Sequence, residues 1–282
     1  FLSVNATAGF RSTMYSRSLD GSGQLTPTNL LRQYFSARTD IIGPVFAKIW
    51  DTPDSASFER MKHVIEPTFN VDYVTEISNQ NRVPSTSGIS DLVVGGSTRF
   101  TYGLTNRLFY RARPLEEAAG RTLTREFLTV GVQQTYYTQP LASRSDTTYV
   151  SSSGRPRPVD LSPISVTTRV SPTETIDATS RLEYDVSGNG LQVFTTGGTA
   201  TVGRSSGNLT YSRVRYSKAS SLTHMLTGST SLRWHEGRLG GTFATSWDIA
   251  RSDFVSQTGM FSYIAQCCGV QVRSEEHTSE LQ

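Results

Sequence analysis

The sequence predicts an all-β protein, an antiparallel meander that forms part of a transmembrane β-barrel, with about 12 strands. Three observations predict this fold. Hydrophobic residues make up only 36% of the 282 residues and charged residues only 18%, whereas soluble domains average roughly 45–50% and 25%. Apolar and polar residues alternate with a period of two through most of the chain. Several alternating segments extend to about ten residues, the length of a transmembrane strand rather than of a soluble one.

The alternation gives each segment one apolar face and one polar face. In residues 1–10, Leu2, Val4 and Phe10 share one face, and Asn5 and Thr7 share the other. Further alternating segments are 61–76, 99–107, 128–136, 164–170, 176–184, 191–203, 208–217, 222–235, 239–251 and 255–272. Turn residues separate several of them, at Ser171-Pro172, Ser187-Gly188-Asn189-Gly190 and Ser205-Ser206-Gly207. We therefore expect consecutive hairpins.

Longer polar stretches interrupt the alternation and are expected to be loops. They are residues 18–29, 51–60, 77–92, 111–123 and 139–160. Transmembrane barrels join their strands by short turns on the periplasmic side and longer loops outside, and both kinds of connection are present. No run approaches the ~18 consecutive apolar residues of a membrane-spanning helix, and residues 1–10 lack the pattern of a signal peptide. We expect an internal piece of a longer exported chain, which would not assemble alone because two sheet edges would stay unpaired.

We expect the sequence to consist of two segments. Residues 1–272 are assigned to the barrel domain, without an internal boundary. Residues 273–282, RSEEHTSELQ, look like a translated sequencing adapter and are excluded from fold reasoning. The remaining chain is mildly basic, which a solvated surface explains as well as an anionic partner does.

Tyrosines and tryptophan recur near the ends of the expected strands. Examples are Tyr15, Tyr73, Tyr110, Tyr136 and Trp234. Such positions are typical of the aromatic girdles at the two membrane interfaces. Ordinary cross-strand packing explains any one of them equally well, so only the repetition favours a girdle.

The residue pattern argues against an enzyme, a metal site, a cofactor and nucleic-acid binding. The histidines His63, His224, His235 and His277 are dispersed. Glu66 and Asp72 would lie ~20 Å apart along one strand, too far for joint acid–base chemistry. The glycine pairs Gly95-Gly96, Gly197-Gly198 and Gly240-Gly241 fall within expected strands, where we expect them to relieve bends or crowding in the wall.

Cys267 and Cys268 are the only cysteines, and they are adjacent. Placed near the end of the last strand, they would point to opposite faces, so separate partners outside this sequence are expected. The alternatives are two thiols packed as small hydrophobic groups, or a strained vicinal disulfide. An exported location would favour oxidation.

Four stretches resemble the LptD family of lipopolysaccharide-assembly proteins of the bacterial outer membrane. They are Gly43-Pro44-Val45-Phe46, Lys62-His63-Val64-Ile65-Glu66-Pro67, Gly103-Leu104-Thr105-Asn106-Arg107-Leu108-Phe109 and Ser262-Tyr263-Ile264-Ala265-Gln266-Cys267-Cys268-Gly269-Val270. The resemblance covers residues 1–272, the middle and later part of the family's barrel. One departure is Gly269, where relatives commonly have an aromatic residue.

The resemblance implies a transport function without covalent catalysis. It implies a translocon that inserts lipopolysaccharide into the outer leaflet, an LptE-like lipoprotein that plugs the lumen, and a periplasmic Lpt bridge that docks through an N-terminal domain. It also implies that Cys267 and Cys268 form disulfides with cysteines of that domain. The family's lateral gate lies between its first and last strands, so no gate residue is carried over, and Pro67 is explained by a bulge or strand end.

Five arginines are the candidate lumen-facing contacts for sugar, phosphate or the plug: Arg99, Arg107, Arg169, Arg181 and Arg233. Pairing with acidic residues across strands is the simpler explanation for each of them. The alternative functions are a porin-like passive diffusion channel and, from a third class, a secreted β-sandwich or adhesin.

Overall fold

The computed structural model describes residues 2–52, 55, 58–84, 93–112, 124–152, 157–215, 222–234, 237–265 and 268–277. In chain order its strands are β1 (Ser3–Tyr15), β2 (Ser18–Leu19), β3 (Leu25–Thr26), β4 (Leu30–Ile42), β5 (Phe46–Asp51), β6 (Phe58–Val74), β7 (Ser97–Ala112), β8 (Thr124–Tyr137), β9 (Ile164–Val170), β10 (Ile176–Asp185), β11 (Gly190–Val202), β12 (Ser205–Val214), β13 (Thr223–Trp234), β14 (Leu239–Asp248), β15 (Asp253–Ile264) and β16 (Gly269–His277). The described helices are the 3₁₀ turns η1 (Gln80–Arg82), η3 (Pro140–Ser145) and η4 (Val150–Ser152).

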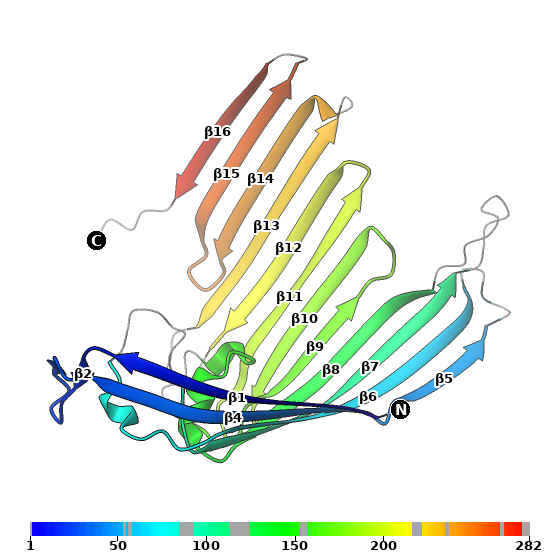
Figure 1. The fold of residues 1–282 in the computed structure, drawn as a ribbon. Coiled ribbons are helices and arrows are strands. Elements are labelled where there is room, and N and C mark those ends of the chain that lie inside the picture. The colour runs from blue at the N-terminus through cyan, green and yellow to red at the C-terminus, as the bar shows by residue number, and fades with distance from the viewer. Residues whose placement is uncertain are drawn as a thin grey trace. The chain divides into compact units, whose positions relative to one another are not determined.

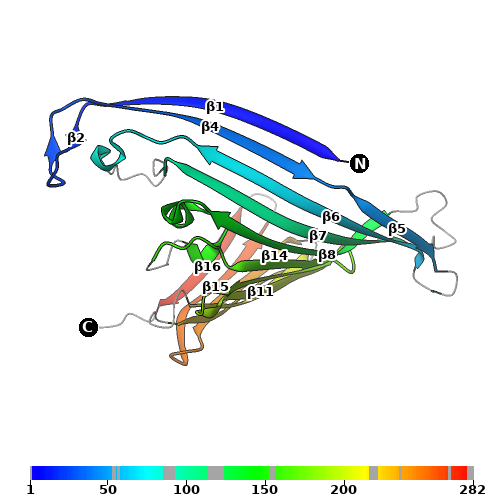
Figure 2. The ribbon, with the colours of Figure 1, turned by 90° about the horizontal axis from the view of Figure 1, so that it is seen from below.

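All but two of the strands belong to one sheet, and β2 and β3 form a separate hairpin. The sheet has 14 strands in the order β1-β4-β6-β7-β8-β9-β10-β11-β12-β13-β14-β15-β16, with β5 also paired to β6. Neighbouring strands follow one another along the chain, as Figure 1 shows for β10 to β16 and Figure 2 for β1, β4 and β6. The fold is therefore the all-β antiparallel meander of a partial barrel that the alternation predicts, with 14 strands in place of about 12.

The chain forms two compact units. Unit 1 comprises Phe1–Phe46, Ile65–Thr105 and Val132–Ile164. Unit 2 comprises Ala47–Val64, Asn106–Gly131 and Ser165–Gln282. Strands β6, β7 and β8 each contribute residues to both units. In the described residues, no helix is long and apolar enough to cross a membrane.

The strand register confirms that the sheet of unit 1 has one apolar and one polar face. Phe10 on β1 lies opposite Phe35 on β4, and Ile41 on β4 lies opposite Phe69 on β6. Directly opposed residues share a face of an antiparallel pair. Phe10 is 68% exposed, so this apolar face is open to the surroundings. On the opposite face, Asp40 faces Asn70 across the same two strands.

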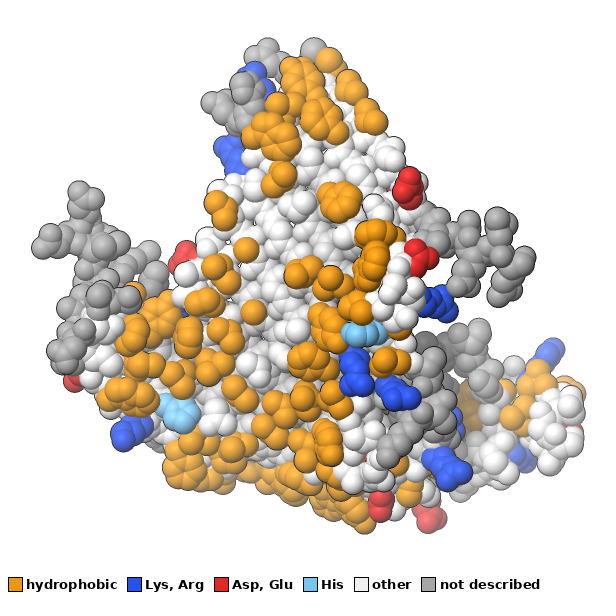
Figure 3. All heavy atoms as spheres, turned by 180° about the vertical axis from the view of Figure 1, so that it is seen from behind, with side chains coloured by type: hydrophobic (Ala, Val, Ile, Leu, Met, Phe, Trp, Pro, Cys, Tyr) orange, Lys and Arg blue, Asp and Glu red, His pale blue; other side chains and the backbone are white. Residues whose placement is uncertain are grey.

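Unit 2 has the same division. Leu232 on β13 is opposite Gly241 on β14, which in turn is opposite Phe261 on β15. These large side chains are also exposed. Figure 3 shows hydrophobic side chains spread over much of one face of the molecule, interspersed with uncharged polar atoms. A sheet with an exposed apolar face is suited to contact with lipid.

One predicted turn is wrong in position, and one turn was not predicted. The predicted turn Ser205-Ser206-Gly207 is part of β12, and the chain turns instead at Gly203-Arg204, where Val202 pairs with Ser205. Gly203 has φ +59°, the conformation that a two-residue hairpin with glycine in the first position requires. The single strand predicted over 255–272 is two strands, β15 and β16, joined by a turn that the Ala265 amide closes by donating to the Cys268 carbonyl at 2.8 Å.

Successive connections of a meander lie at alternate edges of the sheet. The two longest connections, residues 75–96 and 138–163, lie at one edge, here called the long-connection edge. The turns at 203–204 and 265–268 lie at the other, here called the short-turn edge. Strands β12 and β14 end at the long-connection edge, and β13 and β15 begin there.

One glycine of each predicted pair is crowded, as expected, but Gly95-Gly96 precedes β7, so its predicted place within a strand is wrong. A Cβ on Gly197 would lie 2.7 Å from the Thr210 hydroxyl oxygen, whereas a Cβ on Gly198 would have its nearest contact at 3.4 Å. A Cβ on Gly240 would lie 2.6 Å from the Ser262 hydroxyl oxygen. Pro67 lies inside β6, one residue beyond Thr68, where the pairing with β4 stops. Of the two expected explanations, a strand end is therefore wrong, and a bulge stays a prediction.

Candidate functional site

The polar face of unit 1 carries a ladder of charges across three neighbouring strands. On β4, Arg38 donates from Nε and Nη2 to the two carboxylate oxygens of Asp40, each at 2.9 Å. Asp72 on β6 lies 3.8 Å from Arg38 and 3.4 Å from Arg99 on β7. Asn70 donates to Asp40 at 2.6 Å. The carboxylates therefore alternate with guanidinium groups, and the ladder has charges of both signs fixed at close range.

A column of hydroxyl groups continues this face from β7 to β8. The Thr101 and Thr135 hydroxyls are hydrogen-bonded at 2.8 Å, and the Thr135 hydroxyl is bonded at 2.9 Å to that of Tyr149. Thr135 also exchanges hydrogen bonds with Ser162, because its amide donates to the Ser162 hydroxyl and its carbonyl accepts from the Ser162 amide, both at 2.8 Å. Thr135 is fully buried.

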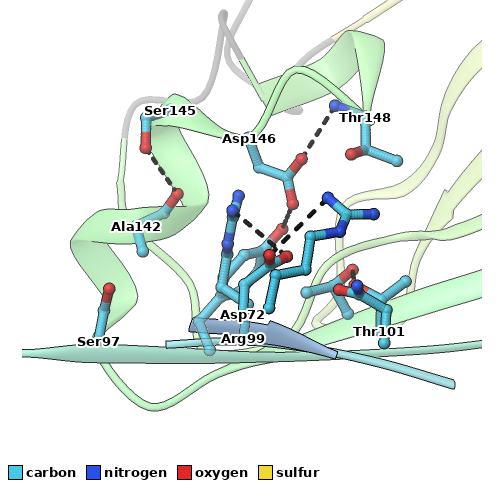
Figure 4. A network of polar contacts seen from close by, with 12 residues as sticks. Asp72, Ser97, Arg99, Thr101, Ala142, Ser145, Asp146 and Thr148 are labelled. Carbon is cyan, nitrogen blue, oxygen red and sulfur yellow. Dashed lines mark hydrogen bonds and ion pairs between the residues drawn. The ribbon is translucent and has the colours of Figure 1, made fainter. Parts of the chain in front are cut away.

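The cover over Thr135 is the connection between β8 and β9, described at residues 138–152 and 157–163 and here called the covering segment. The Tyr137 hydroxyl donates to the Asp146 carboxylate at 2.7 Å, and the other oxygen of Asp146 accepts from the Thr148 amide at 2.9 Å. Figure 4 shows Asp146 on the same side of the sheet as Arg99 and Asp72. Tyr137 is 1% exposed and Tyr149 2%, so the segment is packed onto the strands.

Short-range sequence features explain how the covering segment folds. Pro140 starts the turn η3, where its missing amide donor is not needed. Ser145 donates back to the Ala142 carbonyl at 3.1 Å, and the Val159 amide donates to the Ser143 hydroxyl at 3.1 Å. Side-chain hydroxyls thus satisfy a backbone that runs outside the sheet ladder.

Four of the five predicted arginines pair with acidic side chains. Arg99 pairs with Asp72 at 3.4 Å, Arg107 with Glu126 at 4.0 Å, Arg169 with Asp177 at 2.8 Å and Arg181 with Glu183 at 2.7 Å. Arg233 is exposed, and its backbone amide donates to the Ser205 hydroxyl oxygen at 3.1 Å. Asp72 joins Arg99 to Arg38, and neither Arg38 nor this role of Asp72 was predicted from the sequence.

Cys268 lies at the short-turn edge, directly before β16 rather than within a strand. Cys268 is exposed, in the turn between β15 and β16, and Cys267 lies outside the described residues. The argument from opposite faces of a strand therefore does not apply to the pair, and its pairing stays a prediction. Among the described residues, no cluster of three or more His, Cys, Asp or Glu side chains could hold a metal ion.

The meander, its exposed apolar face and its ion-paired polar face define the class as a membrane β-barrel wall. The chain belongs to the LptD family, described as LPS transport system D, whose profile matches residues 1–247. This is a family of outer-membrane transport proteins. The matched range ends before the stretch Ser262 to Val270 that contains the cysteines. The search of curated proteins found no match.

Proposed function

We propose that this chain forms part of the wall of a translocon that inserts lipopolysaccharide into the outer leaflet of the bacterial outer membrane. The observation that carries the proposal is the match to the LPS transport family over residues 1–247. The two-faced sheet supports it, because an apolar face toward lipid and a polar face toward a lumen are what a transmembrane wall requires. We assign residues 1–272 to the barrel and keep 273–282 as adapter sequence, although β16 extends to His277.

The polar face would act by guidance rather than by chemistry. In this proposal Arg99, Arg107, Arg169, Arg181 and Arg233 face the lumen. Four of them each pair with a carboxylate of their own, so they offer sugar hydroxyls and phosphates a surface without a large net charge of one sign. The covering segment lies at the long-connection edge, which corresponds to the cell exterior in barrels of this class. A covered outer end would direct lipopolysaccharide sideways into the leaflet.

The proposed partners are the lipoprotein plug, LptE-like, and the periplasmic Lpt bridge reached through an N-terminal domain. The short-turn edge corresponds to the periplasm, and Cys268 lies in a turn at that edge. Disulfides from Cys267 and Cys268 to that domain would fix it beneath the barrel. Non-reducing electrophoresis of the full-length protein should show a mobility shift that the double variant C267S/C268S loses.

Depletion of the full-length protein in its bacterium tests the proposal. We expect newly made lipopolysaccharide to stop reaching the cell surface, measured by surface labelling, while other outer-membrane barrels are still inserted. A passive diffusion channel gives the opposite result. Its depletion would lower the uptake of small solutes and leave surface lipopolysaccharide unchanged.

A further inference from the structure

The apolar face of unit 2 carries a row of large side chains near the long-connection edge. Tyr211 on β12 is opposite Leu226 on β13, and Leu226 is opposite Trp247 on β14. Phe254 on β15 is paired with Trp247, with ring centroids 4.4 Å apart and nearly perpendicular rings. Aromatic rows near strand ends are typical of the membrane interface. This row marks the boundary of the hydrocarbon on that side.

Basic side chains follow directly beyond this row. Arg213 lies opposite His224 across β12 and β13, and on its other side it lies opposite Phe194 on β11. Arg213 is two residues from Tyr211 on the same face, which is ~7 Å further toward the edge. The position is therefore that of lipid headgroups, just outside the hydrocarbon.

Arg213 differs from the arginines of the polar face in its partners. In the described part of the chain, no carboxylate forms an ion pair with Arg213, whereas Arg169 and Arg181 each have one. The nearest acid along the neighbouring strands, Asp248, is opposite Met225 and therefore on the polar face. Arg213 thus presents a guanidinium on a lipid-facing surface where no carboxylate of the described residues neutralises it.

The groups around Arg213 are held in place. The Tyr211 hydroxyl and the His224 Nε2 are hydrogen-bonded at 2.7 Å, and their rings meet edge to face with centroids 5.2 Å apart. The Phe194 ring packs against Tyr211 with centroids 5.9 Å apart. An ordered rim of aromatic groups beside a guanidinium offers both an apolar contact for an acyl chain and charged donors for a headgroup.

We propose that Arg213, with the Tyr211–His224 pair beside it, binds the phosphate of a glycolipid in the outer leaflet, on the outer surface of the wall. The guanidinium donates in a fork that matches two phosphate oxygens, and the low polarity of the interface strengthens such a charge-assisted contact. This binding site is separate from the proposed lumenal route and requires only that the long-connection edge faces the cell exterior. It would hold a resident lipid against the barrel beside the point of delivery.

Binding of lipid A to the full-length protein tests this proposed binding site. The purified protein is titrated with phosphorylated lipid A and with the same lipid after enzymatic removal of its phosphates, and bound lipid is counted by native mass spectrometry. The wild type should bind the phosphorylated form about 10-fold more tightly, the effect of one hydrogen-bonded charge. R213Q should lose this preference, and R213K should keep part of it.

The matched control is R251Q, which removes an exposed arginine from the same edge of unit 2, where Arg251 pairs with Asp248 at 3.8 Å. It should bind both lipids as the wild type does. The proposal is overturned if R213Q keeps the full preference, if R251Q loses as much as R213Q, or if inorganic phosphate displaces the lipid. Surface display of lipopolysaccharide in R213Q cells reports on the proposed transport function separately, and we expect it to persist.

Discussion

Two regions of the same sheet differ in the interactions that stabilise them. One is strand β8 with the covering segment, and the other is strands β12 to β16. Around β8, Tyr137, Tyr149, Thr135 and Asp146 are buried and joined by hydrogen bonds. In the strands β12 to β16, no described residue is buried. The first region has a small polar core of its own. The second has the backbone ladder and a surface that lipid must cover.

This difference shows that a membrane wall can be stabilised in two ways within one meander. Where a connection folds back over the polar face, side chains contribute buried contacts that do not depend on the membrane. Where the connections are tight turns, the apolar side chains become buried only in lipid or detergent. Substitutions should therefore have large intrinsic effects in the first region and environment-dependent effects in the second.

The largest effect is expected for Y137A. It removes a fully buried ring and leaves Asp146 without its hydroxyl donor, so we expect a loss of about 3–5 kcal/mol. Y137F removes only the donor and should lose about 1–3 kcal/mol. Protease protection of residues 138–163 in the detergent-solubilised full-length protein measures both. The comparison fails if F243A, at an exposed ring of β14, destabilises detergent-solubilised protein as much as Y137A does.

The next effect concerns two adjacent glycines of β11 on opposite faces. G197A places a methyl group 2.7 Å from the Thr210 hydroxyl oxygen and 3.1 Å from the Leu209 carbonyl oxygen, so we expect a loss of about 1–3 kcal/mol. G198A meets only ordinary contacts of 3.4 Å or more and should change stability by less than about 0.5 kcal/mol. Thermal unfolding in detergent compares them. Equal losses of stability in the two variants would show that crowding on the polar face does not explain the glycine at position 197.

The alternation in the sequence was sufficient to predict the fold and its faces because period two is a direct property of extended backbone. Phe69, Tyr102, Leu104 and Tyr136 were assigned to the apolar face, and all four are exposed. Strand β4 was not recognised, because it has mixed faces in which Leu30, Arg32 and Tyr34 alternate with Leu31, Gln33 and Phe35. Tertiary pairing with β1 and β6 decides its conformation.

The site was predicted less completely than the fold. Arg99 was named, but its partner Asp72, and Arg38, which also contacts Asp72, come from strands whose register the sequence does not give. The covering segment was predicted as a loop, and nothing in its Ser-rich composition indicates that Asp146 and Tyr149 pack back onto β8. Long-range hydrogen bonds fix that return. The position of Cys268 was misplaced because a tight turn without a strong turn signal looks like continued strand.

A smaller difference in stability is expected between substitutions of two ion-paired carboxylates on the polar face, Asp72 and Asp177. Asp72 contacts both Arg38 and Arg99 and its side chain is only 17% exposed, so D72N should lose about 1–3 kcal/mol. Asp177 pairs with an Arg169 side chain that is 64% exposed, so D177N should lose at most about 1 kcal/mol. Raising the salt concentration should remove the effect of D177N and leave most of that of D72N. Unfolding midpoints at two salt concentrations measure this, and equal salt sensitivity would contradict it.

The smallest effect is a pH dependence of the β2–β3 hairpin, at the exposed Asp20. The Ser22 hydroxyl and the Gln24 and Ser22 amides donate to its carboxylate, and these bonds lower the pKa of Asp20 below its ordinary value. A lowered pKa in the folded state means that the contribution is complete above the ordinary pKa and is lost as the pH falls through the folded value. Hydrogen exchange at the Ser22 and Gln24 amides should therefore lose protection only in acid, beyond the change expected from intrinsic exchange rates. D20N should weaken the protection at neutral pH and remove this acid step, and an unchanged step in D20N would assign the transition to another group.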